Sequence, residues 1–84
     1  MKTIQELDQV VLCRDLPEYG LCAGDIGTVV LIHRGGESYE VEFITLDGET
    51  IAVTTLLADE VRPIASKEMA HVRPLSGNLP SAQE

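Results

Sequence analysis

Ser38-Tyr39-Glu40-Val41-Glu42-Phe43 and the residues that follow it, up to Thr54, decide the fold class. The six residues alternate strictly, which places Tyr39, Val41 and Phe43 on one face of a strand and the polar residues on the other. Asp47-Gly48 is a tight-turn signal, and residues 50–54 return as a second strand with Ile51 and Val53 facing inward. The stretch therefore predicts a β-hairpin with one buried face.

Similar short β-branched runs, separated by turn residues, recur along the rest of the chain up to residue 64. Residues 9–14 and 28–33 indicate two earlier strands, and Gly35-Gly36 indicates the turn before residue 38. A tight helical turn over 56–60 leads to a short strand at 61–62, which Pro63 ends or places at a sheet edge. We therefore expect an all-β fold, a small five-stranded antiparallel barrel, with a core made of Val10, Leu12, Val29, Leu31, Tyr39, Val41, Phe43, Ile51, Val53 and Val61.

The chain divides by composition into a barrel over residues 1–64 and a C-terminal tail over residues 65–84. Eighty-four residues suffice for one domain. The tail is rich in Ser, Pro, Gly, Asn and Gln, and only residues 66–71 can form one or two turns of helix. We expect residues from 76 onward to be disordered.

The net charge disfavours several kinds of partner. The chain carries −8, and residues 1–64 hold twelve acidic and four basic side chains. Such a surface repels phosphate backbones and anionic membranes, so we expect no membrane partner and regard nucleic acid as an unfavourable one. Because the first residues contain no signal-peptide-like apolar run and no stretch approaches membrane-spanning length, we expect a cytoplasmic protein.

Chemistry-bearing residues are few and scattered. Cys13, Cys22, His33 and His71 show neither CxxC nor HxxxH spacing, and no third group is placed to orient a catalytic base. Glu40 and Glu42 share a strand face, which is normally a solvated face and not an acid–base pair. We therefore expect no enzyme activity, no catalytic residue, no metal site and no cofactor.

The segment Ala23-Gly24-Asp25-Ile26-Gly27-Thr28-Val29-Val30 resembles the turn of KOW-type and other SH3-like barrels. With residues 17–21, 39–43, 46–48 and 58–63 it also resembles a family of small, mostly bacterial proteins catalogued as domain of unknown function number four-nine-two-six. The resemblance covers residues 4–64. It implies a five-stranded SH3-like barrel, and it brings no activity, cofactor or catalytic residue with it.

Two strands are apolar on both faces, Val10–Cys13 and Val29–Ile32. Their outer sides require a cover, because large apolar patches are uncommon on stable monomers. Three candidates fit: the tail through Met69, Val72 and Leu75, a second copy of the chain, or a different protein. Alternatively, a strand that curls around the barrel has both of its faces buried.

These features favour a non-catalytic protein-interaction or accessory module. Its partner is another protein, expected to be basic, or a second copy of the chain; the neutralising member of a toxin and antitoxin pair is one example. The alternative is a KOW-like module that binds nucleic acid or joins a ribonucleoprotein. An acidic rim around aromatic anchors would steer a basic partner. The expected protein-binding residues are Pro17, Glu18, Tyr19, Tyr39, Val11, Val30, Glu40 and Glu42, with Glu49 at the border.

Overall fold

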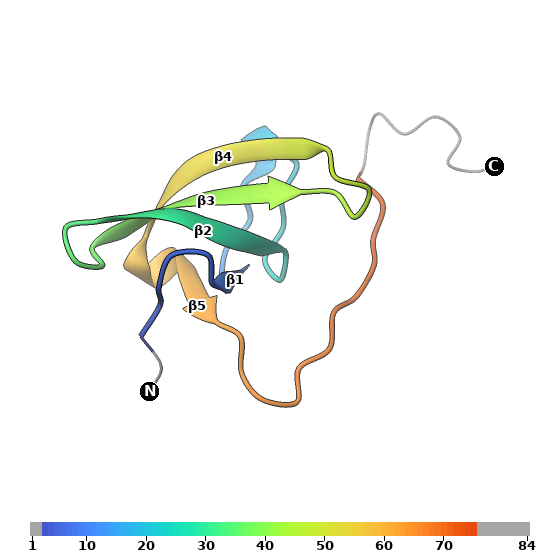
Figure 1. Ribbon diagram of the computed structural model, residues 1–84. Helices are drawn as coiled ribbons and strands as arrows, with labels where there is room; N and C mark the ends of the chain where they lie inside the picture. Colours follow the sequence, from blue (N-terminus) through green and yellow to red (C-terminus); the bar gives the residue numbers. More distant parts are fainter. Residues whose placement is uncertain (1–2, 76–84) are drawn as a thin grey trace.

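The computed structural model describes residues 3–75 and contains five strands and two short 3₁₀ turns (Figure 1). Within these residues no α-helix occurs, so the all-β prediction is confirmed. In chain order the elements are β1 (Gln9–Leu12), η1 (Pro17–Tyr19), β2 (Ile26–His33), β3 (Ser38–Ile44), β4 (Thr50–Leu57), η2 (Ala58–Glu60) and β5 (Val61–Pro63).

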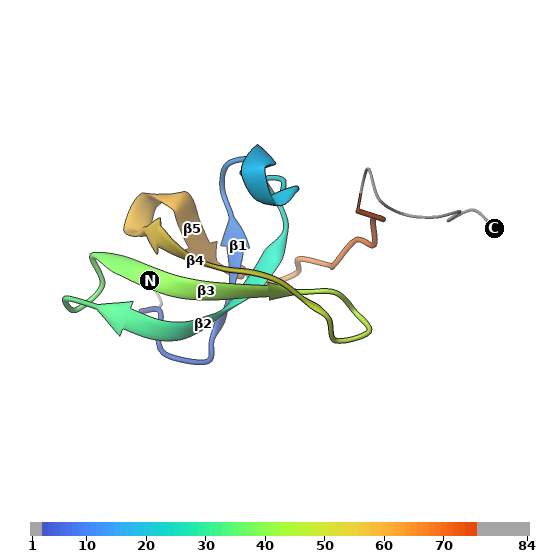
Figure 2. The ribbon, with the colours of Figure 1, turned by 90° about the horizontal axis from the view of Figure 1, so that it is seen from above.

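The five strands form one antiparallel sheet in the order β4-β3-β2-β1-β5. Figure 2 shows β1 running steeply across the direction of β3 and β4, so the sheet folds over and encloses a core. β4 and β5 are the two edges; η2 connects them directly, and within the described residues no ladder joins them. The strand order is compatible with an SH3-like barrel, although the sheet is not closed.

The core lies between the two halves of the folded sheet. Its fully buried members include Val10 and Leu12 from β1, Val29 from β2 and Val41 from β3. The remaining buried apolar residues are Leu16, Leu21, Tyr39, Phe43, Ala52, Leu56 and Val61. Seven of the ten expected core residues are therefore buried. The other three are Leu31 and Val53, which are exposed, and Ile51, which is half-buried.

Gly27 in β2 allows its backbone to pack closely against Val41 and Phe43. A Cβ atom at this position would lie 2.5 Å from Val41 Cγ1 and 2.8 Å from Phe43 Cε1. These distances are shorter than real carbon contacts, because packed carbon atoms separate by about 3.5–4.0 Å. The glycine is thus required by packing, since its backbone φ is ordinary.

The prediction that Leu31 is in the core is wrong, because β2 contains a register shift. The pairing with β3 changes between Val29 and Leu31, so Val30 and Leu31 both face outward, with 40% and 44% of their surfaces exposed. Beyond this bulge the alternation resumes with the opposite phase, and Ile32 packs against the core instead.

The inward face of β4 was also predicted with the wrong phase. Ala52 pairs with Phe43 and is buried together with Leu56, whereas Val53 is 54% exposed and Ile51 is half-buried against the core. The pairing with β3 shifts between Phe43 and Ile44, which pair with Ala52 and Thr50, so Ile51 is the extra residue of a bulge and the buried face of β4 continues through Ala52 and Leu56.

The chain after β5 forms no helix or strand between residues 64 and 75, so the predicted helical turns at 66–71 are wrong. It swings away from the sheet as the orange arm in Figure 1. Met69 and Val72 are 92% and 71% exposed, so these two residues of the first candidate cover do not cover the strands, whereas Leu75 is half-buried. The expected disorder from residue 76 lies outside the described residues, and the domain boundary at 64/65 stays a prediction.

Candidate protein-interaction surface

The outer face of β2, β3 and β4 carries exposed apolar residues next to carboxylates. Cross-strand pairing aligns Leu31, Glu40 and Thr55 in one row and Thr28, Glu42 and Val53 in the next. The bulge adds the side chain of Val30 to the same face. We call the set Val30, Leu31, Glu40, Glu42, Val53 and Thr55 the outer sheet patch.

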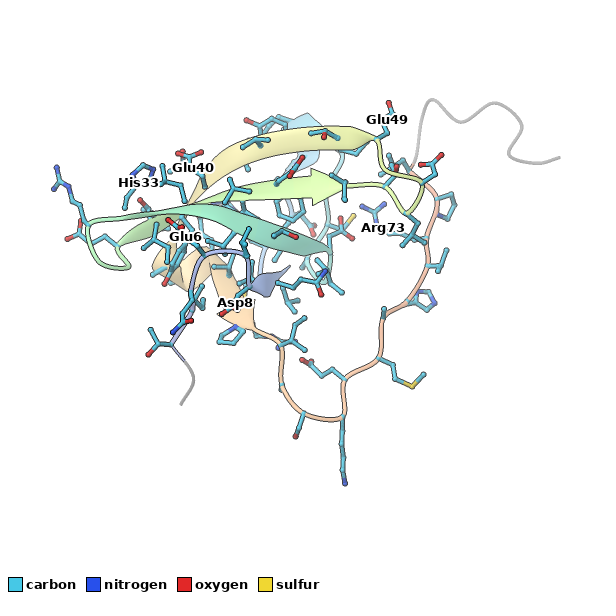
Figure 3. The ribbon with its side chains drawn as sticks, in the orientation of Figure 1. Glu6, Asp8, His33, Glu40, Glu49 and Arg73 are labelled. Carbon is cyan, nitrogen blue, oxygen red and sulfur yellow. The ribbon has the colours of Figure 1, made fainter. Side chains whose placement is uncertain are left out.

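Glu40 is the best-held carboxylate of the outer sheet patch. Its Oε2 accepts a hydrogen bond from Thr55 Oγ1 at 2.5 Å and lies 2.9 Å from His33 Nε2, so all three strands meet at this group. Figure 3 shows the Glu40 and His33 side chains together above the sheet. The hydrogen bonds from Thr55 and then His33 hold the pKa of Glu40 below its ordinary value, and the group is ionised at neutral pH.

Glu42 lies in the next row and is more loosely held. Its Oε2 accepts one hydrogen bond from Thr50 Oγ1 at 2.9 Å. None of the ion pairs formed among residues 3–75 involves Glu42. Its negative charge is therefore uncompensated, beside the exposed side chain of Val53.

The predicted residues Pro17, Glu18 and Tyr19 lie together on η1, and Tyr19 is 41% exposed. Figure 2 shows η1 on the side of β4 away from β2 and β3. These three residues are accessible, but they belong to a different part of the surface from the outer sheet patch. The single continuous contact surface expected from the sequence is thus divided into two.

Two further predicted residues do not lie where expected. Tyr39 is 7% exposed and is a member of the core, because the inward phase of β3 includes it. Val11 is half-buried and pairs with Ile26, four residues before Val30 on β2 and so about 13 Å away along the strand. Glu49, the expected border residue, is exposed beside the β3–β4 turn (Figure 3).

A second site, which the sequence reasoning missed, joins the tail to the loop between η1 and β2. Arg73 donates from Nε to Asp25 Oδ1 at 2.9 Å and from Nη2 to Asp25 Oδ2 at 2.5 Å. Burial of Asp25 favours its neutral form, but the bonds from Arg73 and from the Cys22 N–H outweigh burial and lower the pKa of the carboxyl. Two sequence signals lie near it, the Gly24-Asp25 turn and the repetition of Val61-Arg62-Pro63-Ile64 as Val72-Arg73-Pro74-Leu75, but neither predicts the contact.

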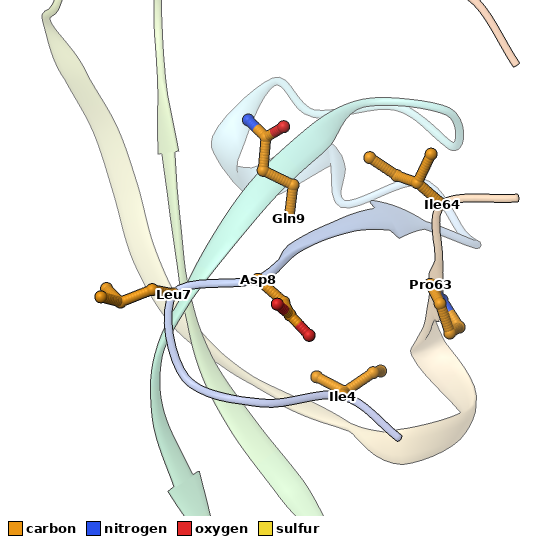
Figure 4. A pocket seen from close by; sticks show the side chains of 6 residues that line it. All are labelled: Ile4, Leu7, Asp8, Gln9, Pro63 and Ile64. Carbon is orange, nitrogen blue, oxygen red and sulfur yellow. The ribbon is translucent and has the colours of Figure 1, made fainter. Parts of the chain in front are cut away.

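A shallow pocket of about 330 Å³ lies between the N-terminal segment and β5 (Figure 4). It is lined by Ile4, Leu7, Asp8, Gln9, Pro63 and Ile64. Asp8 is its one carboxylate, and Oδ2 already accepts the Gln5 N–H at 2.9 Å. The lining holds no pair of groups that could perform acid–base chemistry together.

Between residues 3 and 75, no three His, Cys, Asp or Glu side chains are grouped closely enough to hold a metal ion. Over the same span, no helix has the length and apolar character needed to cross a membrane.

Comparison with known proteins assigns a family. Neither the curated proteins nor the solved structures contain a significant match to the chain. A family model described as a domain of unknown function, DUF4926, matches residues 6–63, from the segment before β1 to the end of β5. Because this match spans more than half of the 84 residues, the chain belongs to the DUF4926 family.

Proposed function

We propose that this protein is a non-catalytic interaction module that binds a basic protein through the outer sheet patch. The observation that carries the proposal is the combination, on one face, of exposed Val30, Leu31 and Val53 with the carboxylates of Glu40 and Glu42. Apolar side chains supply contact area when they are desolvated, and the carboxylates select a partner of opposite charge.

The overall charge supports a basic partner over a second copy of the chain. A symmetric dimer through the outer sheet patch would bring Glu40 and Glu42 of two chains together, each chain carrying −8. Like charges at an interface are unfavourable, whereas a basic partner is attracted from a distance. The same charge argues against the alternative role of binding nucleic acid.

Affinity capture with matched charge variants tests the proposal. The tagged full-length chain and its Glu42→Lys and Asp59→Lys variants are used to capture proteins from the native cells, and the captured proteins are quantified by mass spectrometry. Both variants change the net charge equally, but Asp59 lies on η2 and outside the outer sheet patch. We expect a basic protein that the wild type and Asp59→Lys retain and that Glu42→Lys retains at least tenfold less.

Two results would contradict the proposal. Equal retention of the partner by Glu42→Lys would remove the outer sheet patch from the interface. The other is capture of nucleic acid by the chain, with every co-purifying protein removed as well by nuclease treatment. That result would favour the alternative function, binding of nucleic acid.

A further inference from the structure

We propose that the loop around Asp25 is a receptor for an arginine side chain of the partner, and that Arg73 of the tail occupies this receptor in the free protein. This inference rests on the proposed function, which supplies a basic partner. It adds a second contact site, on a different part of the surface from the outer sheet patch, and it names the side chain that this site recognises.

The way in which Arg73 is bound defines the chemistry of the receptor. Its guanidinium spans both carboxylate oxygens of Asp25, and Nη2 also donates to the carbonyl oxygen of Gly20 at 3.1 Å. The acceptors thus match the planar, forked donors of arginine, which form paired bonds to a carboxylate that a lysine ammonium cannot reproduce. The receptor therefore selects arginine over lysine.

The loop itself holds these acceptors in place. Leu16 and Leu21 exchange two backbone hydrogen bonds, of 2.9 and 3.1 Å, and both side chains are buried. Gly20 ends η1 in the left-handed conformation, with φ of 73°, and Asp25 Oδ2 accepts the Cys22 N–H at 2.9 Å. Because none of these contacts involves Arg73, the acceptor geometry exists before any arginine arrives, which favours binding.

The same loop has room beside the bound guanidinium. A cavity of about 270 Å³ is lined by Arg73 together with Asp15, Pro17, Gly20, Leu21 and Cys22. Asp15 is held at its rim by accepting the Ala23 N–H at 2.8 Å. A partner segment can therefore place an apolar side chain against the exposed Pro17 while its arginine approaches Asp25.

The tail is suited to being displaced. The neighbouring Val72 is 71% exposed and the side chain of Arg73 itself is 31% exposed, so polar bonds to Asp25 and Gly20 supply much of the attachment at this position. A tethered group competes with an effective concentration in the millimolar range. A partner that also contacts the outer sheet patch can overcome this competition.

The test uses the full-length chain and a synthetic peptide with the sequence of residues 70–75. The peptide is titrated into ¹⁵N-labelled wild type and into the Arg73→Gln variant, and the amide signals of Gly20, Cys22 and Asp25 are followed. We expect saturable shifts in Arg73→Gln at a peptide concentration at least tenfold lower than in the wild type, because the receptor is then vacant. A peptide carrying glutamine in place of arginine should produce no shifts.

Two further variants serve as controls. Arg62→Gln breaks the other arginine–carboxylate pair of the tail, between Arg62 and Glu68, and should leave peptide binding as in the wild type. Asp25→Asn combined with Arg73→Gln should abolish the shifts. A dispersed amide spectrum of each variant verifies that it is folded.

The inference is overturned if Arg73→Gln shows no arginine-dependent shifts at millimolar peptide, or if the added Asp25→Asn change leaves them intact. The outcome is independent of the capture experiment, because Glu42 lies outside the receptor. Peptide binding without capture of a basic protein would support the receptor and contradict the proposed function alone; the reverse result would contradict the receptor alone.

Discussion

Gly27 shows at the scale of one residue how the fold restricts its sequence. A methyl group at this position would meet Val41 Cγ1 and the ring of Phe43, both of which are held by the core. We predict that Gly27→Ala lowers the free energy of unfolding by about 1–3 kcal/mol through overpacking. Urea unfolding measures this loss.

The Val41→Ala background supplies the control for Gly27, since it removes the atom nearest to the added methyl group. Gly27→Ala should cost less there than in the wild type, because neighbouring substitutions of this kind are coupled. Equal losses in both backgrounds would show that Gly27 is not in contact with Val41.

Asp25 gives a pH-dependent prediction. Its pKa in the folded chain lies below the ordinary 3.8, so its ionised form adds stability above about pH 4, and that stability is lost as the pH falls through the folded pKa. The difference in thermal stability between the wild type and Asp25→Asn should therefore be constant near neutral pH and shrink below about pH 4. A difference that grows on acidification would contradict the ion pair with Arg73.

At the scale of the element, β4 carries two adjacent leucines with opposite environments. Leu56 is 2% exposed and Leu57 is 58% exposed. We predict that Leu56→Ala costs about 2–5 kcal/mol of unfolding free energy and that Leu57→Ala costs under about 1 kcal/mol. Thermal unfolding of both variants measures the difference, and equal losses would place β4 in another register.

The strands could be predicted from the sequence, but their phase could be predicted only in part. The alternation in Ser38–Ile44 correctly placed Tyr39, Val41 and Phe43 in the core, because the extra residues of both register shifts lie on the neighbouring strands β2 and β4 and not on β3. It failed at Leu31 and Val53. The register shift in β2 and the one that makes Ile51 an extra residue in β4 both depend on the partner strand, so neither is visible in a local pattern.

The candidate sites were harder to predict than the strands for the same reason. The carboxylates of Glu40 and Glu42 followed from the alternation in β3, whereas the separation of Val11 from Val30 follows from pairing between β1 and β2. The contact of Arg73 with Asp25 joins residues 48 positions apart, across a tail without regular structure. Local patterns hold no information about such a contact.

At the scale of the whole molecule, the net charge predicts that the protein does not bind DNA or RNA. We expect no binding of random-sequence DNA or RNA at micromolar protein and physiological salt. Residues 1–64 hold four basic side chains against twelve acidic ones, so binding would release few counterions from the nucleic acid. Fluorescence anisotropy measures this binding. Micromolar affinity that weakens steeply with salt would favour a nucleic-acid function instead.

Carboxyl footprinting of the full-length chain, free and in complex with the basic protein that it captures, tests whether the outer sheet patch is the binding surface. Carbodiimide coupling modifies accessible carboxylates, and mass spectrometry reports the extent at each residue. We predict that the complex protects Glu42 of the outer sheet patch severalfold while Asp59 on η2 reacts as in the free chain. Unchanged labelling of Glu42, or protection confined to Asp59 and its neighbours, would contradict it.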